Sequence, residues 1–179
     1  LRLGLFEQPL VGREQVRLHT RTDAQLALAD RVAADTLVLL RNEGALPLAS
    51  RASIAVIGPN ADSPRSLFGD YSYIAHVESL LEVLKSGQNV FAMPVAGGVD
   101  VDPAGVFDGV VTVCEALIAR LPEAAITHVA GCGVTGDDRS GFAQAVAAAA
   151  AADVAVMVMG ERSGLTDDCT VGESRDVAS

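Results

Sequence analysis

Val154-Ala-Val-Met-Val-Met159, followed by Gly160, is the stretch of this sequence that decides the fold. Its unbroken apolar run has the length of a buried strand, and the glycine ends it. The chain then opens into a loop with five carboxylates, which are Glu161, Asp167, Asp168, Glu173 and Asp176. Because ligands of open α/β sheets bind beyond the carboxyl ends of the strands, we interpret this loop as the first candidate site. A solvated acidic loop without a function is the alternative.

Helices and strands alternate along the rest of the chain. Residues 23–41 are rich in helix formers, with an apolar face made by Leu26, Ala29, Ala33 and Leu37, and Thr22 or Asp23 can cap this helix. Short apolar runs between glycine- and proline-containing segments predict the strands. The expected helices are 23–41, 77–84, 110–121 and 141–152, the expected strands are 53–57, 90–94, 125–130 and 153–159, and loops are expected at 42–48, 61–77 and 96–109.

This order of elements is typical of an α/β fold. The strands read as fully buried, and buried parallel strands need helices on both faces of the sheet. We therefore expect a mainly parallel sheet covered by helices on both faces, an α/β sandwich. Residues 1–22 differ in composition and are assigned to the end of a preceding domain and a linker, which leaves residues 23–179 for the α/β domain. Because the chain begins at Leu1 without an initiator methionine, we expect it to be a piece of a longer protein.

Composition and charge exclude several classes of partner. Hydrophobic residues make up 50% of the chain and tryptophan is absent, so the core must consist mainly of Ala, Val, Leu and Ile. The net charge of −10 and the single lysine argue against nucleic acid and anionic membranes, which both require dense positive charge. The longest apolar stretch, 143–159, is broken by Asp153 and is too short to span a membrane. Cys114, Cys132 and Cys169 have no CxxC spacing, which indicates neither a metal site nor a disulfide framework.

Two glycine-containing turns do not fit a phosphate-binding loop. Gly58-Pro-Asn-Ala-Asp62 follows a strand but lacks the second and third glycines of the dinucleotide fingerprint, and Pro59 removes an amide donor. Gly131-Cys-Gly133 is followed by Asp137 and Asp138, whose charges would repel a phosphate. Both segments are interpreted as simple turns, and no cofactor is expected.

A second candidate for ligand contact is the loop Gly69-Asp-Tyr-Ser-Tyr73 with His76 beyond it. Tyr71 and Tyr73 could stack on a sugar ring, because an aromatic face covers the apolar C–H face of a pyranose. A role as a structural plug explains the two tyrosines equally well. Ser163 also lies in a glycine-flanked loop, but it lacks the G-x-S-x-G setting of a serine hydrolase nucleophile.

Taken together, several motifs resemble those of a known family. The chain is similar to the second domain of family-three glycoside hydrolases, the β-glucosidase and β-xylosidase group, preceded by the last residues of their catalytic barrel, which fall within residues 1–22. The resemblance covers almost the whole chain in the right order. Its motifs are Arg2-Leu-Gly-Leu-Phe-Glu-Gln-Pro9, Leu37-Val-Leu-Leu-Arg-Asn-Glu-Gly-Ala-Leu-Pro-Leu48, Ile54-Ala-Val-Ile-Gly-Pro-Asn-Ala-Asp62, Gly69-Asp-Tyr-Ser72, Ala130-Gly-Cys-Gly133 and Gly172-Glu-Ser-Arg-Asp176.

The resemblance implies a retaining hydrolase that removes β-linked glucosyl or xylosyl units from a non-reducing end. One carboxylate attacks the anomeric carbon, and a second, about 5 Å away, protonates the leaving oxygen. The nucleophile of the family is an aspartate of the barrel domain, which lies outside this chain. The general acid/base maps onto Glu173, with Asp168 and Glu161 as runners-up. Asp70, Tyr71 and Arg162 are expected to line the sugar site, no metal or cofactor is implied, and the barrel of the same polypeptide is the expected partner.

The end of the chain departs from the family pattern. Many members continue with arginine and a Leu-x-Leu-Pro segment, whereas Val177 follows Asp176 here and the chain stops at Ser179. We therefore expect these residues alone to form an incomplete sheet. The alternative to the enzyme is a non-catalytic α/β module that binds carbohydrate or serves as a structural partner.

Overall fold

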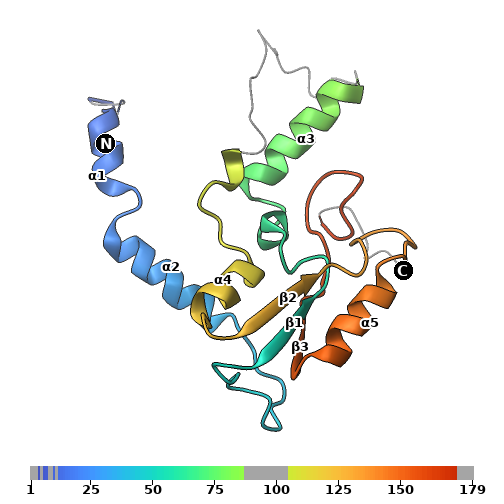
Figure 1. Ribbon diagram of the computed structural model, residues 1–179. Helices are drawn as coiled ribbons and strands as arrows, with labels where there is room; N and C mark the ends of the chain where they lie inside the picture. The colour runs from blue at the N-terminus through green and yellow to red at the C-terminus, as the bar shows by residue number, and fades with distance from the viewer. Residues whose placement is uncertain (1–3, 5, 8–9, 11, 87–104, 173–179) are drawn as a thin grey trace. The chain divides into compact units, whose positions relative to one another are not determined.

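A computed structural model describes residues 4, 6–7, 10, 12–86 and 105–172 of the chain (Figure 1). The chain divides into two compact units, Leu1–Leu46 and Pro47–Ser179. Each unit is described by itself. The division at residue 46 lies beyond the boundary expected at residues 22 and 23, and that boundary stays a prediction about the longer protein.

The first unit contains two helices, α1 (Arg13–His19) and α2 (Asp23–Asp35). Thr22 caps α2 as expected, because its hydroxyl accepts from the amide of Gln25 while the Gln25 side chain accepts from the amide of Thr22. The expectation of a helix through residue 41 is wrong. The helix ends at Asp35, and Thr36 closes it with a 2.7 Å hydrogen bond from its hydroxyl to the carbonyl of Ala33.

The chain after α2 is extended rather than helical. Residues 37–40 form a run of leucine and valine without polar residues to define a helix face, and their side chains are exposed in this unit. Asn42 then folds the following turn, since its side-chain oxygen accepts from the amides of Gly44 and Leu46 at 3.2 and 3.0 Å. The helix expected from the sequence is therefore six residues too long at its carboxyl end.

The second unit is built on a parallel sheet of three strands, β1 (Ser53–Ile57), β2 (Ala125–Val129) and β3 (Val154–Met157). Their order is β2-β1-β3, so β1 lies in the centre and its apolar residues are buried. The expected parallel sheet is confirmed. The strand expected at 90–94 lies outside the described residues.

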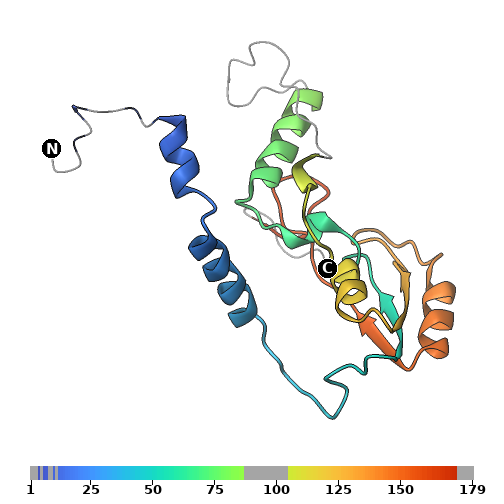
Figure 2. The ribbon, with the colours of Figure 1, turned by 60° about the vertical axis from the view of Figure 1, so that its left-hand side comes forward.

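Helices cover both faces of this sheet. Helix α4 (Val113–Arg120) lies on the face of Ile54 and Val56, and helix α5 (Phe142–Ala151) lies on the face of Ala55 and Ile57. Figure 1 and Figure 2 show the two helices on opposite sides of the strands. The α/β sandwich expected from the sequence is therefore observed, with a core of Ala, Val, Leu and Ile.

Helix α3 (Tyr73–Ser86) begins four residues earlier than expected. Ser72 stands before it, and its hydroxyl accepts from the amide of Ala75 at 3.4 Å and donates to the carbonyl of Gly69 at 2.7 Å. Tyr73 and His76 therefore lie on a helix and not in a ligand-facing loop, which corrects that expectation. Two short 3₁₀ helices, η1 (Pro64–Leu67) and η2 (Gly105–Phe107), complete the described elements of this unit.

The cysteines are free, and Cys114 and Cys169 are buried. Burial raises the pKa of the Cys114 thiol, which keeps it protonated and unreactive. No described helix is long and apolar enough to cross a membrane.

Strand order places the carboxyl ends of β1 and β3 side by side, at the edge of the sheet where α/β proteins generally bind ligands. The connections after β1 and β2 pass on opposite faces, so the order β2-β1-β3 reverses between β1 and β3. Gly58 and Gly160 follow these two strands, and the side-chain amide of Asn60 donates to the carbonyl of Gly160 at 3.1 Å. The chain after β3 therefore starts where α/β proteins generally bind ligands.

Candidate functional site

The acidic loop after β3 closes on itself. The amide of Arg162 donates to the hydroxyl of Thr170 at 2.8 Å, and the amide of Thr170 donates to the carbonyl of Arg162 at 2.9 Å. The amide of Gly164 donates to the carbonyl of Val171 at 3.1 Å. We call residues 160–172 the acidic loop. Its two ends are held side by side, so the position at which the chain leaves it after Gly172 is defined.

Arg65, from η1, joins this loop to helix α3. Only 7% of the residue is exposed. Its Nε donates to both carboxylate oxygens of Glu78 at 2.8 Å, its Nη1 donates to the carbonyl of Phe68 at 3.0 Å, and its Nη2 donates to the carbonyl of Ser163 at 2.8 Å. A buried guanidinium is tolerated only when its charge and donors are satisfied, and here three separate segments satisfy them.

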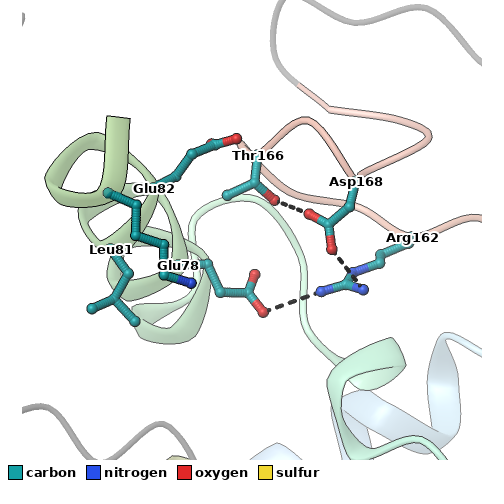
Figure 3. A pocket seen from close by; sticks show the side chains of 7 residues that line it. Glu78, Leu81, Glu82, Arg162, Thr166 and Asp168 are labelled. Carbon is teal, nitrogen blue, oxygen red and sulfur yellow. Dashed lines mark hydrogen bonds and ion pairs between the residues drawn. The ribbon is translucent and has the colours of Figure 1, made fainter. Parts of the chain in front are cut away.

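Arg162 and Asp168 form the second ion pair of the site. The Arg162 Nη1 lies 2.9 Å from an oxygen of Asp168, and its Nη2 lies 3.4 Å from Glu78, so Glu78 is shared by Arg65 and Arg162. The Nε of Arg162 is buried and has no hydrogen-bond partner among the described residues. Figure 3 shows Arg162 between the two carboxylates.

A cavity of about 360 Å³ opens between α3 and the acidic loop. Carboxylates face it from both sides, with Leu81 on the α3 side and Arg162 between Glu78 and Asp168 (Figure 3). It is lined by Glu78, Leu81, Glu82, Lys85, Arg162, Thr166 and Asp168. Carboxylate acceptors and guanidinium donors around a hollow of this size suit a neutral ligand rich in hydroxyl groups.

Asp168 is held in its ionised form. A hydrogen bond from the Thr166 hydroxyl is the main cause that lowers the pKa of Asp168, and the charges of Arg162 and Arg65 lower it further. A general acid needs a pKa raised toward neutrality, so this environment disfavours Asp168 as a proton donor.

The structure brings together some of the expected site residues. Asp70 accepts a hydrogen bond from the Ser163 hydroxyl, and its Oδ2 lies 3.3 Å from the position that a Cβ on Gly172 would occupy. Asp70, Arg162 and Asp168 are thus grouped around the acidic loop. Tyr71 lies in the turn before α3 and is 77% exposed, and Glu161 is also exposed. Glu173 and Asp176 lie outside the described residues.

Sequence reasoning missed Arg65 and Glu78. Arg65 falls in a stretch interpreted as a loop, where nothing indicates burial. Glu78 and Glu82 carried a usable signal, because carboxylates four residues apart share one face of a helix and indicate a cationic or donor partner there. Glu78 pairs with Arg65 and Arg162. Glu82 accepts a hydrogen bond from the amide of Asp167 at 3.3 Å. Among the described residues, no group of His, Cys, Asp and Glu side chains is arranged to hold a metal ion.

The parallel sheet, the two helix layers and the acidic loop at its carboxyl edge define an α/β sandwich with a candidate site beside the sheet. Residues 37–179 match the model of the glycosyl hydrolase family 3 C-terminal domain. The match covers most of the chain. The chain therefore belongs to glycosyl hydrolase family 3, as the resemblance of its motifs indicated.

Curated relatives and a solved structure agree with this family. A periplasmic beta-glucosidase of Salmonella typhimurium is 30% identical over 94% of this chain and 22% of its own length. A beta-xylosidase/alpha-L-arabinofuranosidase 2 of Medicago sativa subsp. varia is 46% identical over 41% of this chain and 10% of its own. The beta-glucosidase of Listeria innocua, solved in complex with glucose, superposes with a TM-score of 0.57 at 25% identity over 89% of this chain and 18% of that one. The chain thus spans about a fifth of the length of the two beta-glucosidases.

Proposed function

We propose that this chain is part of a retaining, exo-acting β-glycosidase that removes glucosyl or xylosyl units from β-linked oligosaccharides or glycosides. Membership of glycosyl hydrolase family 3 and the beta-glucosidase and beta-xylosidase names of the relatives support this activity. The single observation that supports a role for this domain is that hydrogen bonds hold the two ends of the acidic loop together. The loop ends at Gly172 beside Asp70, immediately before Glu173 in the sequence.

Glu173 is the general acid/base in this proposal. It donates a proton to the glycosidic oxygen as that bond breaks, and the resulting carboxylate later removes a proton from the water that releases the sugar. The nucleophile comes from the barrel domain of the same polypeptide, so no residue of this chain is assigned to it. Asp168 is disfavoured by its lowered pKa, and Glu161 is an exposed side chain for which no contact that would hold it in place is described.

Asp70, Tyr71 and Arg162 are proposed as wall residues of the sugar site. The carboxylate of Asp70 can accept hydrogen bonds from sugar hydroxyl groups, the guanidinium of Arg162 can donate them, and the ring of Tyr71 can cover an apolar sugar face. The chemistry needs one proton donor and one nucleophile, and both are protein carboxyl groups. The proposal therefore includes no cofactor.

Replacing Glu173 by Gln in the full-length enzyme tests the assignment. We expect kcat/KM to fall about 10²- to 10⁴-fold for phenyl or alkyl glycosides, because their leaving groups need a proton. The value of kcat/KM for 2,4-dinitrophenyl glycosides should change far less, since that leaving group departs without protonation, although turnover slows because no base activates the water of the second step. In Glu173→Ala, which leaves room for a small anion, azide should restore turnover of the activated substrate and yield a glycosyl azide.

Glu161→Gln is the matched control, because it removes a carboxylate from the same acidic loop. We expect it to leave the ratio of the two rates unchanged. A selective loss in Glu161→Gln with none in Glu173→Gln would move the role to Glu161. If neither variant affected the ratio, the domain would be a non-catalytic α/β module that binds carbohydrate or serves as a structural partner.

A further inference from the structure

Arg65 connects the base of the acidic loop to the rest of the domain. Its guanidinium reaches η1 through Phe68, α3 through Glu78 and the acidic loop through Ser163, with the four contacts between 2.8 and 3.0 Å. In the described part of the chain, the pairs Arg41–Glu43 and Arg51–Glu123 are exposed, but the Arg65 and Glu78 side chains are only 9% and 21% exposed. This pair is therefore screened little by solvent and has few alternative geometries.

The loop packs directly against this guanidinium. A Cβ on Gly164 would stand 2.6 Å from the Arg65 Nη2 and 2.5 Å from the sulfur of Cys169, so the backbone of Gly164 is as close to Arg65 as a glycine allows. The carbonyl of Gly164 in turn fills the place where Gly172 would carry a Cβ. A displacement of Arg65 therefore reaches Gly172 through a single intervening residue.

We propose that Arg65 is a positioning residue of the glycosidase, whose guanidinium fixes the acidic loop and thereby the point at which the chain enters Glu173. This inference rests on the proposed function. Arg65 is buried and its guanidinium bonds protein groups, so in this proposal it acts through the residues that it holds. An arginine suits the role because its planar fork bonds three segments at once, whereas the single ammonium of a lysine has no such geometry.

The test measures proton donation, and not activity alone, in the full-length enzyme. The readout is the ratio of kcat/KM for a phenyl glycoside to kcat/KM for the matching 2,4-dinitrophenyl glycoside. Arg65→Lys keeps the charge but loses the fork, and we expect the ratio to fall about ten- to a hundredfold, as for a catalytic group that is misplaced by about 1 Å. In a Glu173→Gln background the same change should not lower the ratio further, because the group that Arg65 positions is already gone.

Arg51→Lys is the matched control. Arg51 makes the same type of contact, from its Nε to an oxygen of Glu123 at 2.8 Å, but its side chain is 81% exposed and it bonds no other segment of the described chain. The ratio should stay at the wild-type value. Gly164→Ala provides a second route, because the added methyl group would meet the Arg65 guanidinium and the Cys169 sulfur, both at the base of the acidic loop, and it should lower the ratio as Arg65→Lys does.

Loss of activity on both substrates by the same factor, with an unchanged ratio, would overturn the inference and leave Arg65 a purely structural residue. Should Arg65→Lys fail to fold, Gly164→Ala decides by the same ratio. The failure of the proposed function has a different signature. In that case Glu173→Gln itself leaves the ratio unchanged, whereas failure of this inference leaves the effect of Glu173→Gln intact.

Discussion

At the scale of residues, the site depends on two arginines that share one glutamate. Arg65 is buried and hydrogen-bonded to three other residues, whereas Arg162 is partly exposed and lines the cavity. Glu78 alone cannot balance two positive charges, and Asp168 supplies the second negative charge next to Arg162. The four side chains therefore form a balanced network that joins α3 to the acidic loop. Breaking one member leaves a charge without its partner.

Asp168→Asn tests this balance through its pH dependence. The pKa of Asp168 is lowered, first by the Thr166 hydroxyl and then by the two arginines, so its charge stabilises the folded state above the ordinary aspartate pKa of about 3.9. That contribution is lost as the pH falls through the lowered pKa. Because the Asp168 side chain is 58% exposed, we expect Asp168→Asn to cost no more than about 1 kcal/mol at pH 7.

Denaturant unfolding of wild type and Asp168→Asn, at pH 7 and at about pH 2.5, measures this difference. It should be present at pH 7 and should be smaller at the acidic value, because protonation of Asp168 removes the charge that Arg162 and Arg65 stabilise. Asp137→Asn, in the exposed turn after β2, serves as the control and should show no comparable change. A difference that persists unchanged at acidic pH would show that the charge of Asp168 is irrelevant.

At the scale of elements, the strands were predicted well because each is a short run rich in apolar residues between turn-forming segments. Only β1 is buried along its length, so the expectation of fully buried strands is wrong for β2 and β3, which lie at the edges of the described sheet and are largely exposed. Residues 53–57 match β1, and 125–130 and 153–159 exceed β2 and β3 by only one to three residues. Helix ends were predicted less well. Nothing local distinguishes the leucine run after Asp35 from a helix, and the start of α3 at Tyr73 depends on Ser72 rather than on apolar spacing.

The carboxyl ends of β1 and β3 are also held by one glycine. Gly58 has φ +130°, and a Cβ there would overlap the carbonyl oxygen of Val158. Gly58→Ala must therefore strain the backbone and push the two strands apart, and we expect it to lower the free energy of unfolding by more than about 3 kcal/mol. Gly136→Ala, at φ +84° in open space, isolates the backbone cost and should lose about 1 kcal/mol.

Denaturant unfolding of the two glycine variants provides the comparison. Gly58 packs against Val158 and Met159, immediately before the acidic loop begins at Gly160. Its replacement should therefore also increase proteolysis of that loop. Equal losses of stability in the two variants would contradict the close approach of β1 and β3 described here.

At the scale of the whole molecule, the fold could be predicted from the sequence but the site only in part. The order of elements and the buried strands predicted a parallel sheet covered on both faces, and the motifs predicted the family. Arg65 could not be predicted, because its burial results from η1, α3 and the acidic loop meeting in space, 98 residues apart in the case of Ser163. The wall residues and Glu173 stay predictions, because their roles depend on the proposed function and Glu173 lies outside the described residues.

The most direct measurement is the position of Glu173 in a crystal structure of the full-length enzyme with an uncleaved glycoside bound. We predict a Glu173 carboxyl oxygen at about 2.6–3.2 Å from the glycosidic oxygen, on the side from which a proton reaches the leaving group. We also predict that Arg65 bonds Ser163 as it does here. A Glu173 side chain that points into bulk solvent while another carboxyl group contacts that oxygen would contradict the assignment of Glu173.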